Sequence, residues 1–346
     1  MAATMGVRAP IATMRPFEPI VRNPHLLTIL GNFWPRGYDF ASFPEDRRLV
    51  RTDPDTQVLV VTQRPVKAAV GHIVLLHGLE GSGDSGYNRS MAWQALTAGF
   101  IVHRLHMRTC GGTEHLCRTL YHAGLTSDLR SFLTQLKAEN DVHLSPTRGL
   151  PVFLIGFSLG GNVSLKFAGE EGETDLIHGV CAISTPIDLA ASARRIGEPD
   201  NALYEKRFLN RMKERLIATG RYTKADLAGC NTLWEIDDRV TAPSFGFDGA
   251  AHYYGTQSAQ NFLADIRVPT LLIQAKDDSF IPFGIFGHPA IAANPDITLL
   301  ATEYGGHLGF ISKRAPRFWV DEVALGFILA HLPTPVAVGR NNQCGD

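Results

Sequence analysis

The chain has 346 residues, of which 45% are hydrophobic and 19% are charged, and its formal net charge is -1. This is the composition of an ordinary globular protein with ample apolar material for a core. No Lys/Arg-rich block is present, so a nucleic-acid partner is not expected. The five cysteines are scattered without CxxC spacing, which argues against a disulfide framework or zinc site and favours a reducing, cytoplasmic location.

The first segment, residues 1–45, is Pro-rich and aperiodic, and we expect it to run along the surface as an arm. It lacks the long apolar core behind a basic start that marks a signal peptide. No stretch reaches about 18 apolar residues, so no transmembrane helix is expected. Peripheral contact with lipid is left open by this observation.

Short apolar runs recur after the arm and lack strict alternation, as expected of strands that are buried on both faces. They lie at 58–63, 72–78, 100–106, 152–156, 179–184, 269–275 and 297–302. Helix-like segments at 127–140, after Ser158 and at 319–332 separate them. Strands that alternate with helices predict an α/β fold with a mostly parallel central sheet flanked by helices.

One interval interrupts this alternation. Residues 186–265 hold no convincing strand, but they include the helix-prone segment 203–220 and the irregular segment 241–255. The interval is long for one crossover, and its few apolar runs make a separately folding domain the less favoured alternative. We therefore predict a helical cap inserted into a core of residues 46–185 and 266–335, followed by a flexible C-terminal tail, 336–346.

The sequence GFSLG at 156–160 matches the pattern G-x-S-x-G, between a predicted strand and a predicted helix. In that context the motif carries a nucleophilic serine on a sharp turn, which small neighbours permit. The alternative is an ordinary tight turn, because glycine and serine are common. If Ser158 is a nucleophile, the backbone N–H of Leu159 at the helix N-terminus is one donor of an oxyanion hole.

A nucleophilic serine needs a base, and the base needs an orienting carboxylate. Asp277 and Asp278 follow one late predicted strand and His307 follows the next, at the sheet edge where open α/β folds build their sites. Asp278 is favoured as the acid because it stands four residues before Pro282. Asp277 is expected to bind backbone in the turn. His307 is expected to be the base, the alternative being a turn residue.

A second oxyanion donor is expected from the loop after an early strand. The sequence HGLEG at 77–81 has two glycines there, and the backbone N–H of Leu79 is the candidate. His77 is expected to be structural beneath this loop. No H-E-x-x-H or comparable ligand cluster occurs, so neither a metal nor an organic cofactor is predicted.

Aromatic residues of the predicted cap are candidates to line an apolar acyl pocket. They fit a role in anchoring the cap equally well, because aromatic side chains pack cores more often than they contact ligands. These residues are Trp234, Phe245, Phe247, Tyr253 and Tyr254.

Taken together, the chain resembles the α/β-hydrolase superfamily, and more narrowly its YheT-like hydrolases, over residues 20–330. The segments that carry the resemblance are NPHLLT (23–28), HGLEGS (77–82), LYHAGLTSDL (120–129), GFSLGGN (156–162), DDRVTAPSFGF (237–247), YY (253–254), DDSFIP (277–282) and GGHLGF (305–310). The resemblance implies a capped α/β-hydrolase fold with a Ser158–Asp278–His307 triad. Thr109 departs from the family pattern, which has glycine there.

The resulting hypothesis is a serine esterase that cleaves short- to medium-chain acyl esters, small-molecule substrates, through an acyl-enzyme. An alcohol O-acyltransferase is one alternative, because the same triad can pass the acyl group to an alcohol instead of water. A non-catalytic scaffold of the same fold is the other, since fold does not dictate function.

Overall fold

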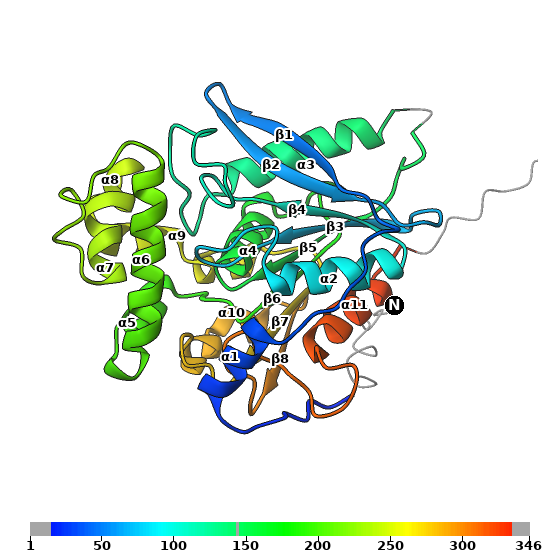
Figure 1. The fold of residues 1–346 in the computed structure, drawn as a ribbon. Helices are drawn as coiled ribbons and strands as arrows, with labels where there is room; N and C mark the ends of the chain where they lie inside the picture. The colour runs from blue at the N-terminus through cyan, green and yellow to red at the C-terminus, as the bar shows by residue number, and fades with distance from the viewer. Residues whose placement is uncertain (1–14, 143–144, 334–346) are drawn as a thin grey trace, which may run out of the picture.

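The computed structural model describes residues 15–142 and 145–333. Its eight strands form one sheet in the order β1-β2-β4-β3-β5-β6-β7-β8 (Figure 1). β2 pairs antiparallel with both β1 and β4, and all the other neighbours are parallel. The strands are β1 (Asp46–Asp53), β2 (Thr56–Gln63), β3 (Gly71–Leu76), β4 (Phe100–Leu105), β5 (Val152–Phe157), β6 (Gly179–Ile183), β7 (Thr270–Ala275) and β8 (Ile297–Thr302). The predicted α/β fold with a mostly parallel sheet is thus confirmed.

Helices cover both faces of the sheet and give it two apolar layers (Figure 1). One layer holds α2 (Gly86–Thr97) and α11 (Trp319–Ala330), and the other holds α3 (Ser127–Asn140) and α4 (Leu159–Glu171). Within β3, Ile73 packs with the first layer and Val74 with the second, because successive strand side chains point to opposite faces. Burial on both faces explains why the central strands read as continuous apolar runs.

Between β6 and β7 the chain forms helices and turns but no strand. Figure 1 shows α5 to α8 grouped beside one end of the sheet. The helices there are α5 (Leu189–Ile196), α6 (Ala202–Ala218), α7 (Leu233–Ile236), α8 (Ala242–Ser244) and α9 (Ala250–Gln257), with a π-helical turn η3 (Asp237–Thr241) and 3-10 turns η2 (Pro199–Asn201), η4 (Ala259–Asn261) and η5 (Leu263–Asp265). A separate apolar cluster, including Leu209, Met212, Leu216, Leu233 and Ile236, holds α6 against α7. The expectation of irregular structure at 241–255 is therefore wrong in part, since α8 and α9 lie there.

Two further elements lie where no element was predicted. The arm contains a helix, α1 (Pro24–Phe33), and the core begins with the edge strand β1. Asn23 caps α1 by accepting the Leu26 N–H at 2.9 Å, and Pro24 occupies the first helical position, as both residue types prefer. β1 was missed because its sequence, DRRLVRTD, is largely charged, as an exposed edge strand tolerates.

The remaining described elements are η6 (Phe283–Gly287) and α10 (Pro289–Ala293), between β7 and β8. None of the helices in the described ranges is long and apolar enough to cross a membrane. The first 14 residues of the predicted arm and the predicted tail, 336–346, lie outside the described residues.

The amino end of the sheet holds a buried chain of hydrogen bonds. The Asn140 amide donates to Nε2 of His72 (3.2 Å), so Nδ1 of His72 carries the proton and donates to Nε2 of His103 (2.9 Å). His103 in turn donates through Nδ1 to the Thr62 hydroxyl (2.9 Å). Burial lowers the pKa of His72 to about 4 and that of His103 well below its ordinary value, so both rings are neutral at pH 7.

We expect acid to destabilise the fold through these rings. Unfolded histidines take up protons near pH 6.5, whereas folded His72 does so only near pH 4, so the free energy of unfolding falls as the pH drops through that window. The decrease in the free energy of unfolding that is due to His72 should be about 1–2 kcal/mol between pH 7 and pH 5. Urea denaturation at both pH values measures it. A His72→Gln variant should lack this decrease, and an unchanged pH dependence would contradict the assignment.

Candidate active site

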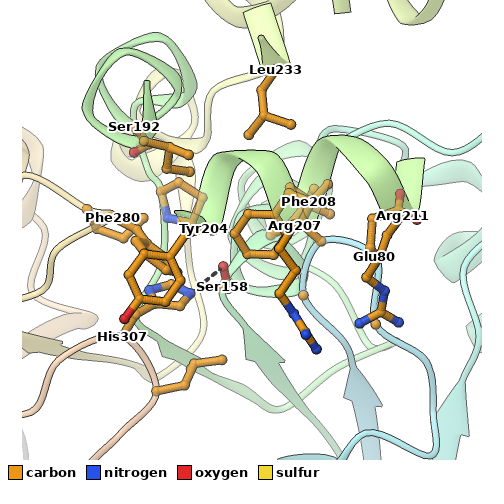
Figure 2. A pocket seen from close by; sticks show the side chains of 18 of the residues that line it. Glu80, Ser158, Ser192, Tyr204, Arg207, Phe208, Arg211, Leu233, Phe280 and His307 are labelled. Atoms are coloured by element: carbon orange, nitrogen blue, oxygen red, sulfur yellow. Dashed lines mark hydrogen bonds between the residues drawn. The ribbon is translucent and has the colours of Figure 1, made fainter. Parts of the chain in front are cut away.

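Ser158, His307 and Asp278 come together beyond the carboxyl ends of β5, β8 and β7. Figure 2 shows the contact between Ser158 and His307. Nε2 of His307 lies 3.0 Å from Oγ of Ser158. Nδ1 of the same ring lies 3.0 and 3.2 Å from the two carboxylate oxygens of Asp278. One imidazole therefore bridges the hydroxyl and the carboxylate, and its Nδ1 proton faces the acid.

The Asp278 carboxylate is held as an acceptor from several sides. Oδ1 accepts the backbone N–H groups of Phe280 (2.9 Å) and Ile281 (3.2 Å), and Oδ2 accepts the Gln274 amide (3.2 Å). These donors fix the orientation of the carboxylate towards the His307 ring.

The neighbouring Asp277 has a different partner. Its Oδ1 accepts the N–H of Gly306 at 2.9 Å, so it links the loop after β7 to the loop that carries His307. Burial raises the pKa of Asp277 above its ordinary value. Of the two adjacent aspartates, only Asp278 contacts the imidazole of His307.

Ser158 sits on a strained turn between β5 and α4. Its φ of 53° lies in the left-handed region, which is costly for a residue with a side chain. Two glycines permit this turn: a Cβ on Gly156 would lie 2.4 Å from the Gly160 carbonyl oxygen, and a Cβ on Gly160 would lie 2.4 Å from that of Leu76. Leu159 begins α4, and its N–H makes no hydrogen bond within the described part of the chain.

The loop after β3 holds Leu79 between two anchored amides. The N–H of Gly78 donates to the hydroxyl of Tyr87 at 2.9 Å, and the N–H of Glu80 donates to that of Tyr121 at 3.0 Å. Between them, the N–H of Leu79 has no hydrogen-bond acceptor among residues 15–142 and 145–333. Leu79 lines the same cavity as Ser158 and Leu159.

His77 lies beneath this loop and is fully buried. Its Nδ1 donates to the Gly78 carbonyl (2.8 Å), and its Nε2 accepts the Met107 N–H (3.1 Å). Burial lowers the pKa of His77 to about 3. Both ring nitrogens are therefore occupied by backbone groups, and the ring supports the loop, as expected from the sequence.

A buried ion pair joins α6 to the same loop. Glu80, at a φ of 53°, accepts the Arg215 guanidinium through Nε at 2.9 and 3.0 Å and through Nη2 at 2.9 Å. Nη1 of Arg215 also donates to the hydroxyl of Thr109 (2.9 Å), and the guanidinium lies over the ring of Tyr121. Burial opposes the charge of Arg215, but Glu80 outweighs it and keeps the Arg215 pKa above its ordinary value.

A cavity of about 610 Å³ opens in front of Ser158 and lies between the sheet edge and the inserted helices. Figure 2 shows Tyr204 and Phe208 of α6 at the end of the cavity where Ser158 and His307 meet. Much of the cavity wall is apolar and includes Leu159, Pro186, Leu189, Ile196, Phe208, Met212, Phe280 and Ile281. A polar end includes Asp237, which accepts the Tyr254 hydroxyl at 2.5 Å and whose pKa burial raises to about 6.

The predicted pocket aromatics divide into two groups. Tyr253 and Tyr254 line the cavity, whereas Trp234, Phe245 and Phe247 do not. For these three the structure does not bear out the pocket role and fits the anchoring role, which the sequence left open as the equal alternative. Trp234 packs edge-on against Tyr254 (centroids 5.0 Å apart), and Phe245 and Phe247 pack against His122 (4.5 and 5.7 Å). These three anchor the inserted helices.

Sequence reasoning missed the contribution of the arm. Thr28 of α1 accepts the backbone N–H of His307 at 2.9 Å and donates to the Pro24 carbonyl at 2.8 Å. Gly31 of α1 packs against Gly309, where a Cβ would come within 2.6 Å of the Gly309 backbone. The segment NPHLLT, which ends in Thr28, was the available signal, because it combines a helix cap with a resemblance to a known family.

Among the residues that the structure describes, no group of three or more His, Cys, Asp or Glu side chains could hold a metal ion. The site described above thus consists of a serine, a histidine, an aspartate and two backbone N–H groups that have no acceptor among the described residues, beside a largely apolar cavity.

The chain is similar in sequence to known proteins. A family model described as the alpha/beta hydrolase family matches residues 73–322. The Escherichia coli protein YheT, named as an esterase, is 31% identical over 309 residues, covering 86% of this chain and 88% of that protein. The medium-chain fatty acid ethyl ester synthase/esterase 2 of Saccharomyces cerevisiae is 30% identical, and the match covers 70% of this chain and 58% of the yeast protein.

Solved structures show the same fold at low sequence identity. An esterase from Pyrococcus furiosus is 16% identical with a TM-score of 0.56, and the match covers 92% of this chain and 100% of that chain. The acylaminoacyl peptidase of Pyrococcus horikoshii is 13% identical with a TM-score of 0.58, covering 85% of this chain and 43% of that chain.

Removing the cation of the buried pair should destabilise the fold strongly. We expect Arg215→Met to lower the free energy of unfolding by about 3–5 kcal/mol, because the Glu80 carboxylate is left buried without its partner. Lys213→Met on the same helix is the matched control and should change it by less than about 0.5 kcal/mol. Adding Glu80→Gln to Arg215→Met should recover most of the loss. Urea denaturation measures all four proteins, and a double variant as unstable as Arg215→Met would contradict this explanation.

Proposed function

Because the chain belongs to the α/β hydrolase family, and within it to the YheT-like proteins, we propose that it is a serine-dependent carboxylic-ester hydrolase. The observation that carries the proposal is the single His307 imidazole that bridges Ser158 and Asp278 beside an apolar cavity. The names of relatives, which include an esterase and a monoacylglycerol lipase, support the same reaction class.

The proposed reaction begins with attack by Ser158. Nε2 of neutral His307 takes the hydroxyl proton as Oγ bonds to the ester carbonyl carbon, and the carbonyl electrons move to its oxygen. Asp278 accepts the Nδ1 proton of His307 in a hydrogen bond, which fixes the ring and stabilises the imidazolium that forms.

The negative charge that develops on the carbonyl oxygen needs donors. The N–H groups of Leu79 and Leu159 have no partner in the described part of the chain and lie on the cavity wall, so we assign them to the oxyanion hole. One such donor typically contributes about 3 kcal/mol of transition-state stabilisation. His307 then protonates the leaving alcohol as the ester C–O bond breaks, which leaves the acyl group on Ser158. In the second half-reaction His307 takes a proton from water as the water oxygen attacks the acyl carbon. The bond to Oγ then breaks, His307 returns the proton to Ser158, and the acid is released.

The size and lining of the cavity support the proposal that the acyl chain of the substrate is short or medium in length. The cavity volume of about 610 Å³ falls within the range of roughly 300–1,000 Å³ that is usual for small-molecule sites, and the wall near Ser158 is apolar. The name of the yeast relative includes both the synthesis and the hydrolysis of medium-chain fatty acid ethyl esters. Both reactions would share the acyl-enzyme and differ in whether water or alcohol attacks it.

The first test is hydrolysis of p-nitrophenyl esters from acetyl to palmitoyl, compared between the parent chain and Ser158→Ala. The parent should show a maximum at one chain length, and Ser158→Ala should lower kcat by about 10⁴-fold or more. Ser192→Ala is the matched control, because Ser192 lines the cavity but its hydroxyl, among the described residues, donates only to the backbone carbonyl of Asp188. Turnover that survives in Ser158→Ala would refute the mechanism, and ethyl esters formed in added ethanol would show alcohol transfer.

The adjacent aspartates provide a second test. Asp278→Asn should lower kcat by about 10⁴-fold, because the amide no longer holds the required tautomer of His307 or stabilises its charged form. Asp277→Asn should lower kcat by less than about tenfold, since Asp277 contacts the Gly306 N–H and not the ring. The same ester assay measures both variants. The reverse ranking would move the acid role to Asp277.

A further inference from the structure

Exposed apolar side chains gather at the mouth of the cavity. On α1, Leu26, Ile29 and Phe33 are 50%, 43% and 66% exposed, and Leu203 at the start of α6 is 84% exposed. Ile29, Phe33 and Leu203 also line the cavity. The spacing of three and four residues puts the three α1 side chains on one helix face, while the buried Leu27, Thr28 and Gly31 face the protein. Exposed apolar patches of this kind mark interaction sites.

α1 and α6 form one continuous surface there. His25 of α1 stacks on Tyr204 of α6, with ring centroids 5.7 Å apart, and its Nδ1 lies 3.4 Å from the tyrosine hydroxyl. The Arg207 guanidinium lies 6.0 Å from the centre of the Phe33 ring. We call Leu26, Ile29, Phe33, Leu203, Lys206, Arg207 and Arg211 the mouth surface.

The mouth surface is cationic as well as apolar. Lys206, Arg207 and Arg211 are exposed on α6 and form no ion pair with the described residues. α1 contains no acidic residue, and nearby Asp200 is paired with Arg195. Because the whole chain has a net charge of -1, this local excess of positive charge is a property of the mouth and not of the protein as a whole.

We propose that the mouth surface docks on a lipid surface that carries negative charge. Apolar side chains ringed by cations fit such a surface, because the former enter the acyl region while the latter meet anionic headgroups. A second copy of this chain fits less well. A two-fold interface through this surface would bring the Lys206, Arg207 and Arg211 side chains of both copies into one interface without acidic partners from the mouth surface. Docking is a binding event and does not require the esterase mechanism proposed above.

The test is cosedimentation of the full chain with vesicles of phosphatidylcholine alone or mixed with phosphatidylglycerol. The parent should bind the mixed vesicles at least about tenfold more tightly, and added salt should weaken this binding. The variant Leu26→Asp/Lys206→Glu alters two residues that do not line the cavity, and Asp is favourable in the first turn of α1. It should lose about tenfold or more in affinity for mixed vesicles while keeping the parental rate on soluble p-nitrophenyl acetate.

A matched control makes the same charge changes at the amino end of β3, on the side of the sheet opposite the cavity. Val66→Asp/Lys67→Glu lies in the loop before β3, where Val66 is 76% exposed, and should bind mixed vesicles like the parent. Equal loss in both double variants would show that only net charge matters and would overturn the proposal. So would equal parental binding to both kinds of vesicle. If Leu26→Asp/Lys206→Glu instead dissociates an oligomer in analytical ultracentrifugation and leaves vesicle binding unchanged, a second copy is the occupant.

Discussion

The close approach of α4 to β3 and β5 is the constraint on which the site depends. A Cβ at Gly156 or Gly160 would overlap backbone atoms at 2.4 Å, so the helix can sit at this distance only over glycine. At that distance the chain must turn sharply after β5, and Ser158 takes a φ of 53°. The turn directs Oγ towards His307 and starts α4 at Leu159, whose N–H has no acceptor in the part of the chain that the structure describes. The strain persists because the surrounding packing leaves the backbone no relaxed alternative.

Two other loops of the site, the one after β8 that carries His307 and the one after β3 that carries Leu79, are held by elements remote in sequence. Thr28 in α1 accepts the backbone N–H of His307, 279 residues away, and Arg215 in α6 binds Glu80, 135 residues away. Thr28 contacts the backbone of His307, and Arg215 contacts Glu80, the neighbour of Leu79. Neither contact involves Ser158. The arm and the inserted helices therefore fix the geometry of the site as well as covering it.

The contrast between predicted and observed features follows from what local sequence encodes. Buried strands and the order of Ser158, Asp278 and His307 can be read locally, because apolar runs and turn residues mark strand ends. The Glu80–Arg215 pair could not be read, since both residues resemble solvated charges until the chain folds. The composition of the aromatic segment did not reveal side-chain direction either, so Trp234 could not be separated from Tyr254 before the structure was known.

The composition of α6 explains why an ion pair, rather than apolar packing alone, joins this helix to the core. Its buried apolar side chains, Leu209, Met212 and Leu216, belong to the cluster shared with α7. The half-buried Tyr204 and Phe208 pack against Phe280 of the core. Arg215 faces the core, and a rotation of the helix that withdrew it would leave the buried Glu80 carboxylate without its partner. A buried pair adds little net stability over an apolar contact, but the penalty for breaking it fixes the register. Arg207 and Arg211 precede Arg215 by two turns and one turn on the same face, so this register also sets where the cations stand at the cavity mouth.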